Sequence, residues 1–233
     1  MHVSENEEDE TLSLSIVDVS DGELQPDGHR PIKVATTRGN VHLRLYEAPA
    51  PRAGIVWVGG VGGGFDSPAD GLYPRLCREL TRKHISSCRV QFRNPRVLEE
   101  AVLDTMVALQ VLTQTGATIT GIVGHSFGGA VALQAATMAR SVKTVVTLAT
   151  QSAGATVAAD LATAQSVLLV HGTADDMLPP ACSRTVERLV PGRKRLVLFD
   201  ANHNLDEAAE AVTDLVRRWL LAELGGDGVA HPV

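Results

Sequence analysis

Residues 119–129 read ITGIVGHSFGG, and this stretch contains a pentad of the pattern Gly-x-Ser-x-Gly. A short apolar run ends at the pentad, and a helix-compatible segment, residues 130–140, follows at once. Gly124 and Gly128 lie two residues before and two residues after Ser126, where a side chain would collide within a tight strand-to-helix turn. The pattern predicts a strained turn that projects the hydroxyl of Ser126, although ordinary glycine-rich turns also carry these letters.

A serine hydroxyl acts as a nucleophile only with a base beside it and an acid that orients the base. Both residue types follow the pentad. The sequence HGTADDMLP at 171–179 comes after an apolar run and offers Asp175 and Asp176 as candidate acids. His203 lies between the last expected strand and the last expected helix and is the candidate base; the alternative is an exposed loop histidine. Asp200, in the same loop as His203, is a weaker candidate for the acid.

A glycine-rich loop, GGVGGG at 59–64, follows the apolar run 54–58. Five glycines in six residues are also typical of loops that bind phosphate, but no Gly-Lys-Ser/Thr follows here. The spacing differs from a dinucleotide-binding fingerprint, and no acidic residue ends the next expected strand, 86–92. The residues of this loop therefore favour neither a phosphate-binding nor a dinucleotide-binding site.

These segments together resemble the α/β-hydrolase superfamily over about residues 30–224. The pentad resembles its nucleophile elbow. The segment 171–179 resembles its G-x-x-D-x-x-V-P acid loop, with Leu178 where the family often has Val. In this match Pro179 sets the register and makes Asp175 the acid in preference to Asp176.

The resemblance also implies an oxyanion hole. One donor is the N–H of Phe127, the residue after the nucleophile. Residues 59–64 resemble the family's H-G-x-x-G loop, which makes the Val61 N–H the second donor. Gly59 stands where the family usually has His, so the glycines alone are expected to let this loop curl inward.

Short Val/Ile/Leu runs alternate with helix-length stretches, which implies α/β architecture with a mostly parallel sheet covered on both faces. Eight strands are expected, at 12–19, 41–46, 54–58, 86–92, 118–123, 143–148, 166–170 and 195–199. The first two alternate apolar and polar residues and are expected to be antiparallel. Only about 15 residues separate Leu148 from Ser166, too few for the helical cap that many α/β-hydrolases insert there. The chain thus resembles the small, lidless branch of dienelactone hydrolases and carboxylesterases.

The resemblance implies a serine hydrolase that cleaves carboxylic esters or thioesters of small, accessible substrates, with Ser126, Asp175 and His203 as catalytic residues and no metal or cofactor. The same catalytic residues also serve peptidases, acyltransferases and cofactor-free perhydrolases, and the fold also occurs in non-catalytic binding or scaffold proteins. Arg93 follows the expected strand 86–92, on the ligand side of a parallel sheet. It is expected to bind a substrate carboxylate or, alternatively, to form a structural salt bridge.

Composition narrows the function further. Residues 1–30 hold nine Asp/Glu and one Arg, whereas the remainder is almost balanced with 18 acids and 20 Lys/Arg. Nucleic-acid binding therefore has no electrostatic support. The N-terminus lacks the pattern of a signal peptide, no apolar run is long enough to span a membrane, and the three Cys lack metal or disulfide spacing. A cytoplasmic protein that binds no membrane, monomeric or a small homo-oligomer, is expected, with one domain over 11–224, a disordered acidic tail at 1–10 and a frayed end at 225–233.

Overall fold

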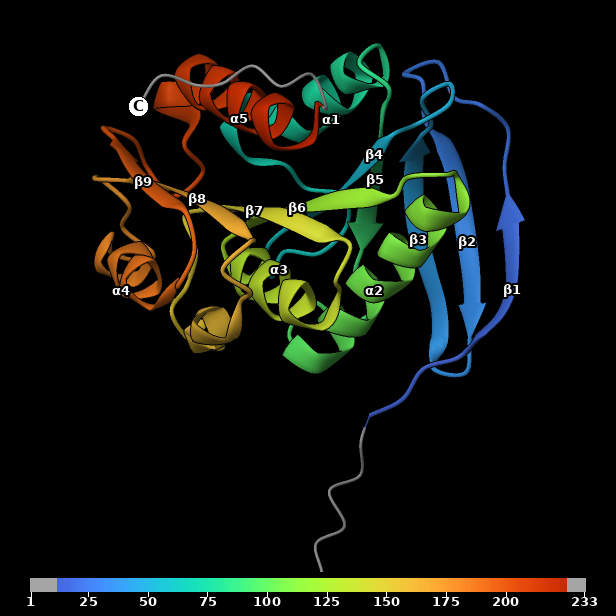
Figure 1. Cartoon of the computed structure of the whole chain (residues 1–233), viewed down its shortest axis with the longest axis horizontal. Helices are drawn as coiled ribbons and strands as arrows, with labels where there is room; N and C mark the ends of the chain where they lie inside the picture. The colour runs from blue at the N-terminus through green and yellow to red at the C-terminus, as the bar shows by residue number, and fades with distance from the viewer. Residues whose placement is uncertain (1–11, 226–233) are drawn as a thin grey trace, which may run out of the picture.

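The alternating apolar runs and helical stretches fold into one mixed sheet with helices on both faces (Figure 1). The computed structural model describes residues 12–225. The expected tail at 1–10 lies outside this range, as does the expected tail at 225–233 except for Gly225. Within it the sheet has nine strands, in the order β1-β2-β3-β5-β4-β6-β7-β8-β9. Their bounds are β1 (Ile16–Asp21), β2 (Arg30–Thr36), β3 (Gly39–Tyr46), β4 (Ala53–Val58), β5 (Ile85–Gln91), β6 (Ile119–His125), β7 (Val142–Leu148), β8 (Ser166–Gly172) and β9 (Lys194–Phe199).

Six neighbouring strands, β5, β4, β6, β7, β8 and β9, are parallel to one another. The sheet continues from β5 with β3, β2 and β1, each antiparallel to its neighbour. The expectation of a mostly parallel sheet is confirmed, but the expected number of eight strands is wrong. The missed strand is β2, which contains Pro31 and is therefore hard to recognise as a strand from its residues. Its buried Ile32 and Val34 nevertheless alternate with less buried neighbours, and β2 pairs with β3 along its whole length.

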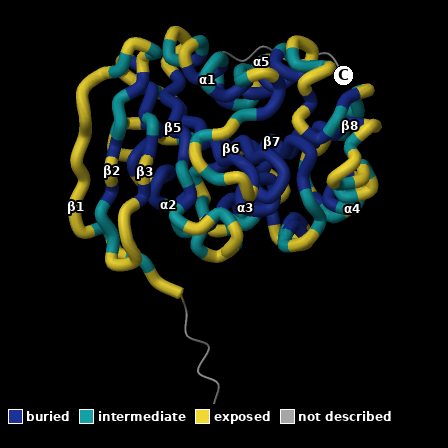
Figure 2. The backbone as a smooth tube through the Cα atoms, turned by 180° about the vertical axis from the view of Figure 1, so that it is seen from behind, coloured by how far each residue is buried: buried dark blue, intermediate teal, exposed yellow. Residues whose placement is uncertain are grey.

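Helices cover both faces of the parallel part (Figure 1). On one face α1 (Pro68–Thr81) packs beside α5 (Ala209–Leu224), and on the other α2 (Leu98–Gln114) packs beside α3 (Phe127–Met138), with α4 (Ala181–Leu189) next to β8 and β9. Two apolar clusters fill the space between helices and sheet. The central strand β4 is buried along its whole length and β6 at all but its first residue, whereas β1 is largely exposed (Figure 2).

The connection from β7 to β8 contains only a short 3-10 turn, η1 (Thr156–Asp160), so no helical cap is inserted at this point of the described chain. A second 3-10 turn, η2 (Asp206–Ala208), leads into α5. Over residues 12–225 no helix combines the length and the apolar character needed to cross a membrane.

The first turn of α1 is left-handed. Ala69, Asp70 and Gly71 have φ values of 50°, 49° and 75°, which only glycine adopts without strain. The N–H of Ala69 donates to the carbonyl of Asn204 at 2.7 Å, which fastens this turn to the loop after β9. The start of α1 and the His203 loop are therefore held against each other.

Candidate active site

The candidate residues follow parallel strands and therefore meet at one edge of the sheet. Ser126 comes directly after β6, Asp175 three residues after β8 and His203 four residues after β9. The glycine-rich loop 59–64 follows β4, which pairs with β6 in the sheet. Segments far apart in sequence are in this way brought to one place by the strand order.

The turn at Ser126 has the strain that the sequence predicts. Ser126 has φ 55° and ψ −119°, a region that non-glycine residues rarely adopt. A Cβ on Gly124 would lie 2.0 Å from the carbonyl oxygen of Gly128, and a Cβ on Gly128 would lie 2.3 Å from that of Gly59. Both distances are far below van der Waals contact. Gly124 is crowded within the turn, as predicted, whereas Gly128 is crowded by residues at the end of β4.

Asp175 and His203 are in direct contact. The Nδ1 atom of His203 lies 2.8 Å from Oδ2 of Asp175, and both side chains are almost completely buried. The other carboxylate oxygen of Asp175 accepts the N–H groups of Met177 and Leu178 at 2.9 and 2.8 Å. Burial raises the pKa of Asp175, but the hydrogen bonds from Leu178, His203 and Met177 outweigh it and hold the pKa below its usual range. This acid is therefore an anion that orients the imidazole. Asp176 and Asp200 are exposed.

The loop that carries His203 is fastened to the elbow by His125, the residue before Ser126. Nε2 of His125 lies 3.1 Å from the carbonyl oxygen of His203, so the ring donates to this backbone group. The two imidazole rings pack with centroids 4.9 Å apart. Burial lowers the pKa of His125 to about 4, which keeps the ring neutral near pH 7. The hydroxyl of Ser126 itself has no hydrogen-bond partner among residues 12–225.

A second histidine contacts the acid. His171 is fully buried, and its Nε2 lies 3.1 Å from Oδ2 of Asp175 and 3.0 Å from the carbonyl oxygen of Leu178. Its Nδ1 lies 2.7 Å from the hydroxyl of Ser183. Burial lowers the pKa of His171. The neutral ring therefore donates from Nε2 and accepts from Ser183. In the sequence, the only sign of this contact is the spacing of four residues between His171 and Asp175.

The candidate oxyanion donors are the N–H groups of Phe127, which follows Ser126 in the chain, and of Val61, in the glycine-rich loop. Phe127 is the first residue of α3, so its N–H has no partner within the helix. A Cβ on Gly60 would lie 3.6 Å from Cβ of Ser126, which brings the glycine-rich loop against the elbow. Val61, next along this loop, is 47% exposed.

Arg93 is held by protein groups. Its Nε lies 2.5 Å from the buried carboxylate of Asp104, and its terminal nitrogens reach Glu100 at 2.7 Å and the carbonyl of Arg38 at 2.6 Å. Its backbone N–H also donates to Asp104, at 2.8 Å. This is the salt-bridge arrangement that the sequence left open as the alternative to substrate binding.

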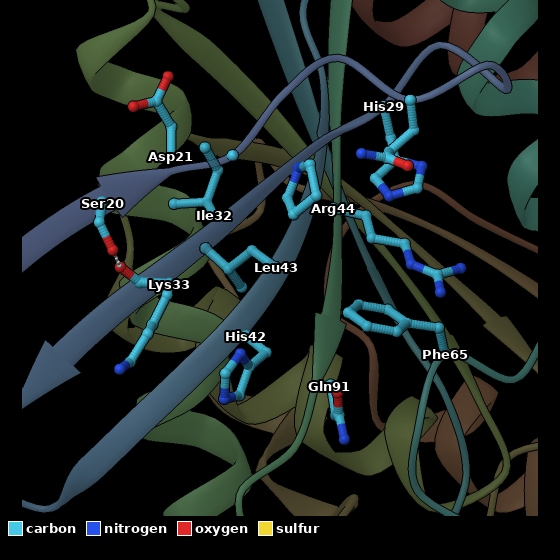
Figure 3. A pocket seen from close by; sticks show the side chains of 13 residues that line it. Ser20, Asp21, His29, Ile32, Lys33, His42, Leu43, Arg44, Phe65 and Gln91 are labelled. Atoms are coloured by element: carbon cyan, nitrogen blue, oxygen red, sulfur yellow. Dashed lines mark hydrogen bonds between the residues drawn. The ribbon is translucent and has the colours of Figure 1, made fainter.

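A hollow of about 620 Å³ lies away from these residues, on the outer face of β2 and β3 (Figure 3). Its lining includes His42, Arg44 and Phe65, but none of Ser126, Asp175 or His203. The hollow is therefore separate from the candidate catalytic residues and does not help to identify them.

No protein-family model matches the sequence, and no curated protein is found as a sequence relative. Solved structures do match. The dienelactone hydrolase from Anabaena variabilis is 18% identical with a TM-score of 0.72 over 84% of this chain and 98% of its own. Est1E from Butyrivibrio proteoclasticus is 17% identical with a TM-score of 0.70, over 83% and 98%. A putative alpha/beta hydrolase from Agrobacterium tumefaciens is 16% identical with a TM-score of 0.67, over 87% and 100%. With its sheet order, its elbow and these likenesses, the chain has the α/β-hydrolase fold in the form found in dienelactone hydrolases and carboxylesterases.

Proposed function

We propose that this protein is a serine hydrolase that cleaves carboxylic esters or thioesters of small, accessible substrates. The observation that carries the proposal is the buried hydrogen bond between His203 and Asp175, at 2.8 Å, together with the contact by which His125 fastens the His203 loop to the strained turn of Ser126. In the proposal the Ser126 hydroxyl joins this pair when substrate binds. A hydroxyl, an imidazole and a carboxylate then form a chain that moves a proton away from the attacking oxygen.

In the proposed reaction Ser126 Oγ attacks the acyl carbonyl carbon while Nε2 of His203 takes the hydroxyl proton. Because Nδ1 of His203 is hydrogen-bonded to Asp175, Nε2 is the ring nitrogen that remains to accept the proton. The imidazolium then protonates the leaving alcohol or thiol as its bond to the acyl carbon breaks. His203 next takes a proton from water as the water oxygen attacks the acyl carbon. It returns this proton to Ser126 Oγ as the bond between Oγ and the acyl carbon breaks, which releases the acid and restores both residues.

The negative charge that develops on the carbonyl oxygen needs donors that are already in place. We assign the N–H of Phe127 and the N–H of Val61 to this role. The first lies at the positive end of α3, which adds a favourable dipole. All of these steps use side chains, backbone groups and water.

The short β7–β8 connection supports the substrate class. With only η1 between these strands, the edge of the sheet at Ser126 has no helical cap over it from this connection. Small or protruding acyl groups fit such an open site better than long chains that need an enclosed tunnel.

The test is hydrolysis of p-nitrophenyl esters of increasing acyl length by wild type and by Ser126→Ala, together with labelling by a fluorophosphonate probe. Stoichiometric labelling is expected in wild type and none in Ser126→Ala. His203→Gln and Asp175→Asn are expected to lower kcat by about 10⁴-fold and about 10³-fold or more. Full ester hydrolysis by Ser126→Ala would refute the mechanism, and absence of labelling in wild type would favour a non-catalytic binding protein.

A further inference from the structure

The glycine-rich loop 59–64 is held by the side chain of Asp66, which lies outside the loop. The sequence led us to expect that glycines alone shape this loop, and that expectation is wrong. The N–H of Gly60 donates to Oδ2 of Asp66 at 3.1 Å. A Cβ on Gly59 would lie 1.6 Å from Oδ1 of the same carboxylate, and the three atoms nearest to that Cβ all belong to Asp66. The carboxylate therefore occupies the space that a side chain at position 59 would take.

Asp66 is itself held in place from the sheet. The guanidinium of Arg89, on β5, is buried and donates to the carbonyl oxygens of Phe65 and Asp66, the latter at 3.4 Å. The guanidinium of Arg44, on β3, lies 4.2 Å from the centroid of the Phe65 ring, and Figure 3 shows the two side chains next to each other. The segment 65–66 is thus fixed on two strands, so its carboxylate is a rigid support for Gly60.

The electrostatic environment fits a supporting role. Burial raises the pKa of Asp66, while the Gly60 N–H and the charge of Arg89 act in the opposite direction. The carboxylate accepts the N–H of Gly60. Arg89 donates to the backbone carbonyl of Asp66, not to the carboxylate, and only its charge favours the ionised form. It has the acceptor atoms needed to orient a loop.

Gly60 lies between Asp66 and the nucleophile. Its Cβ position is 3.6 Å from Cβ of Ser126 and 3.7 Å from Oδ2 of Asp66. A peptide group that is bonded on one side and packed on the other cannot rotate freely. The orientation of the next N–H, that of Val61, depends on it.

We propose that Asp66 is a positioning residue: its carboxylate replaces the missing side chain at position 59 and fixes Gly60, so that the Val61 N–H faces the oxyanion formed at Ser126. The inference rests on the proposed function for its effect on rate, but the contact between Asp66 and Gly60 is tested without any reaction.

The kinetic test compares Asp66→Ala with Asp66→Asn, which keeps a carbonyl acceptor for the Gly60 N–H. Asp66→Ala is expected to lower kcat on p-nitrophenyl acetate, and the rate of fluorophosphonate labelling, by about 10- to 100-fold, with KM changed by less than about two-fold. Asp66→Asn is expected to recover most of both rates. Equal rates in Asp66→Ala and wild type, or equal losses in Ala and Asn at equal thermal stability, would overturn the proposal.

Gly59→Ala supplies a matched test of the geometry. In wild type the added Cβ collides with Asp66 and displaces it, so labelling should slow as it does in Asp66→Gly. In the Asp66→Gly background the same Cβ meets no such obstacle, so Gly59→Ala should add no further loss. Fully additive losses would contradict the arrangement.

An NMR titration separates failure of this proposal from failure of the proposed function. The amide proton of Gly60 is expected to shift with the titration of Asp66 in wild type and to lose that shift in Asp66→Asn. If wild type is neither labelled nor active, the proposed function fails and with it the catalytic role of Asp66. If wild type is active but the Gly60 signal ignores the titration, only the positioning role fails.

Discussion

Replacing His125 with Gln is expected to remove a source of instability in acid. The ring is 6% exposed, packs on His203 and donates to the His203 carbonyl oxygen at 3.1 Å. Burial lowers its pKa from 6.5 to about 4. In the folded protein the ring therefore stays neutral down to about pH 4, whereas in the unfolded chain it takes up a proton below about pH 6.5.

The magnitude follows from this difference in proton binding. A pKa that is lower in the folded state gives stability that is fully present above the unfolded value and is lost as the pH falls toward the folded value. Each unit of pH between the two costs about 1.36 kcal/mol. The contribution of His125 should therefore lower the free energy of unfolding by about 2 kcal/mol at pH 5 and by about 3 kcal/mol at pH 4, relative to pH 7.5.

The assay is urea unfolding of wild type and His125→Gln at intervals from pH 7.5 to pH 4. Gln keeps an N–H donor for the His203 carbonyl. The difference in free energy of unfolding between the two proteins at pH 7.5 therefore reflects packing, and the change of that difference with pH reflects protonation of His125. Met138→Leu, at an exposed position with no titratable group, is the control and should run parallel to wild type. The reasoning is refuted if the wild-type and His125→Gln curves also run parallel, or if NMR finds the His125 ring protonated at pH 6.

Three further substitutions test the fold. Gly124→Ala would place a Cβ 2.0 Å from the Gly128 carbonyl oxygen and should cost about 3 kcal/mol or more of the free energy of unfolding, measured in urea; a loss below about 1 kcal/mol would contradict the tight turn. Asp70→Gly relieves a φ of 49° and should raise that free energy by about 1 kcal/mol, seen as a higher Tm; a lower Tm would refute the left-handed turn. Arg93→Ala leaves the carboxylate of Asp104 buried without its partner and should cost about 3 kcal/mol of the free energy of unfolding, whereas an unchanged urea midpoint with a raised KM would favour the substrate-binding role over the salt bridge.

The strands and helices could be predicted largely from local patterns because buried parallel strands are near-continuous apolar runs. Residues 54–58 and 166–170 illustrate this, since each lies inside an observed buried strand, β4 and β8. The strand β2 escaped prediction because Pro31 weakens its local pattern. Its pairing with β3, which no local property of residues 30–36 reveals, makes it a strand.

The candidate site divides in the same way. The chain order of Ser126, Asp175 and His203 was readable because each follows an apolar run, and parallel strands end at one edge of the sheet. Which acid reaches the imidazole is a matter of distance. Asp175 lies 2.8 Å from His203, whereas Asp176 is exposed. In the sequence the two aspartates are adjacent, and only their position relative to Pro179 distinguishes them.

The sequence by itself determined the requirement for glycine at position 124, because the carbonyl oxygen that a Cβ there would meet belongs to Gly128, four residues on. The crowding at Gly128 comes from Gly59 and therefore belongs to the tertiary structure. Only the tertiary structure decided which partners the polar side chains have. Arg93 meets a buried Asp104, and Asp66 occupies the space left open at Gly59, because these contacts arise where separate elements are packed together. A short turn is governed by local backbone geometry, whereas hydrogen bonds between distant side chains exist only after the sheet and its helices have assembled.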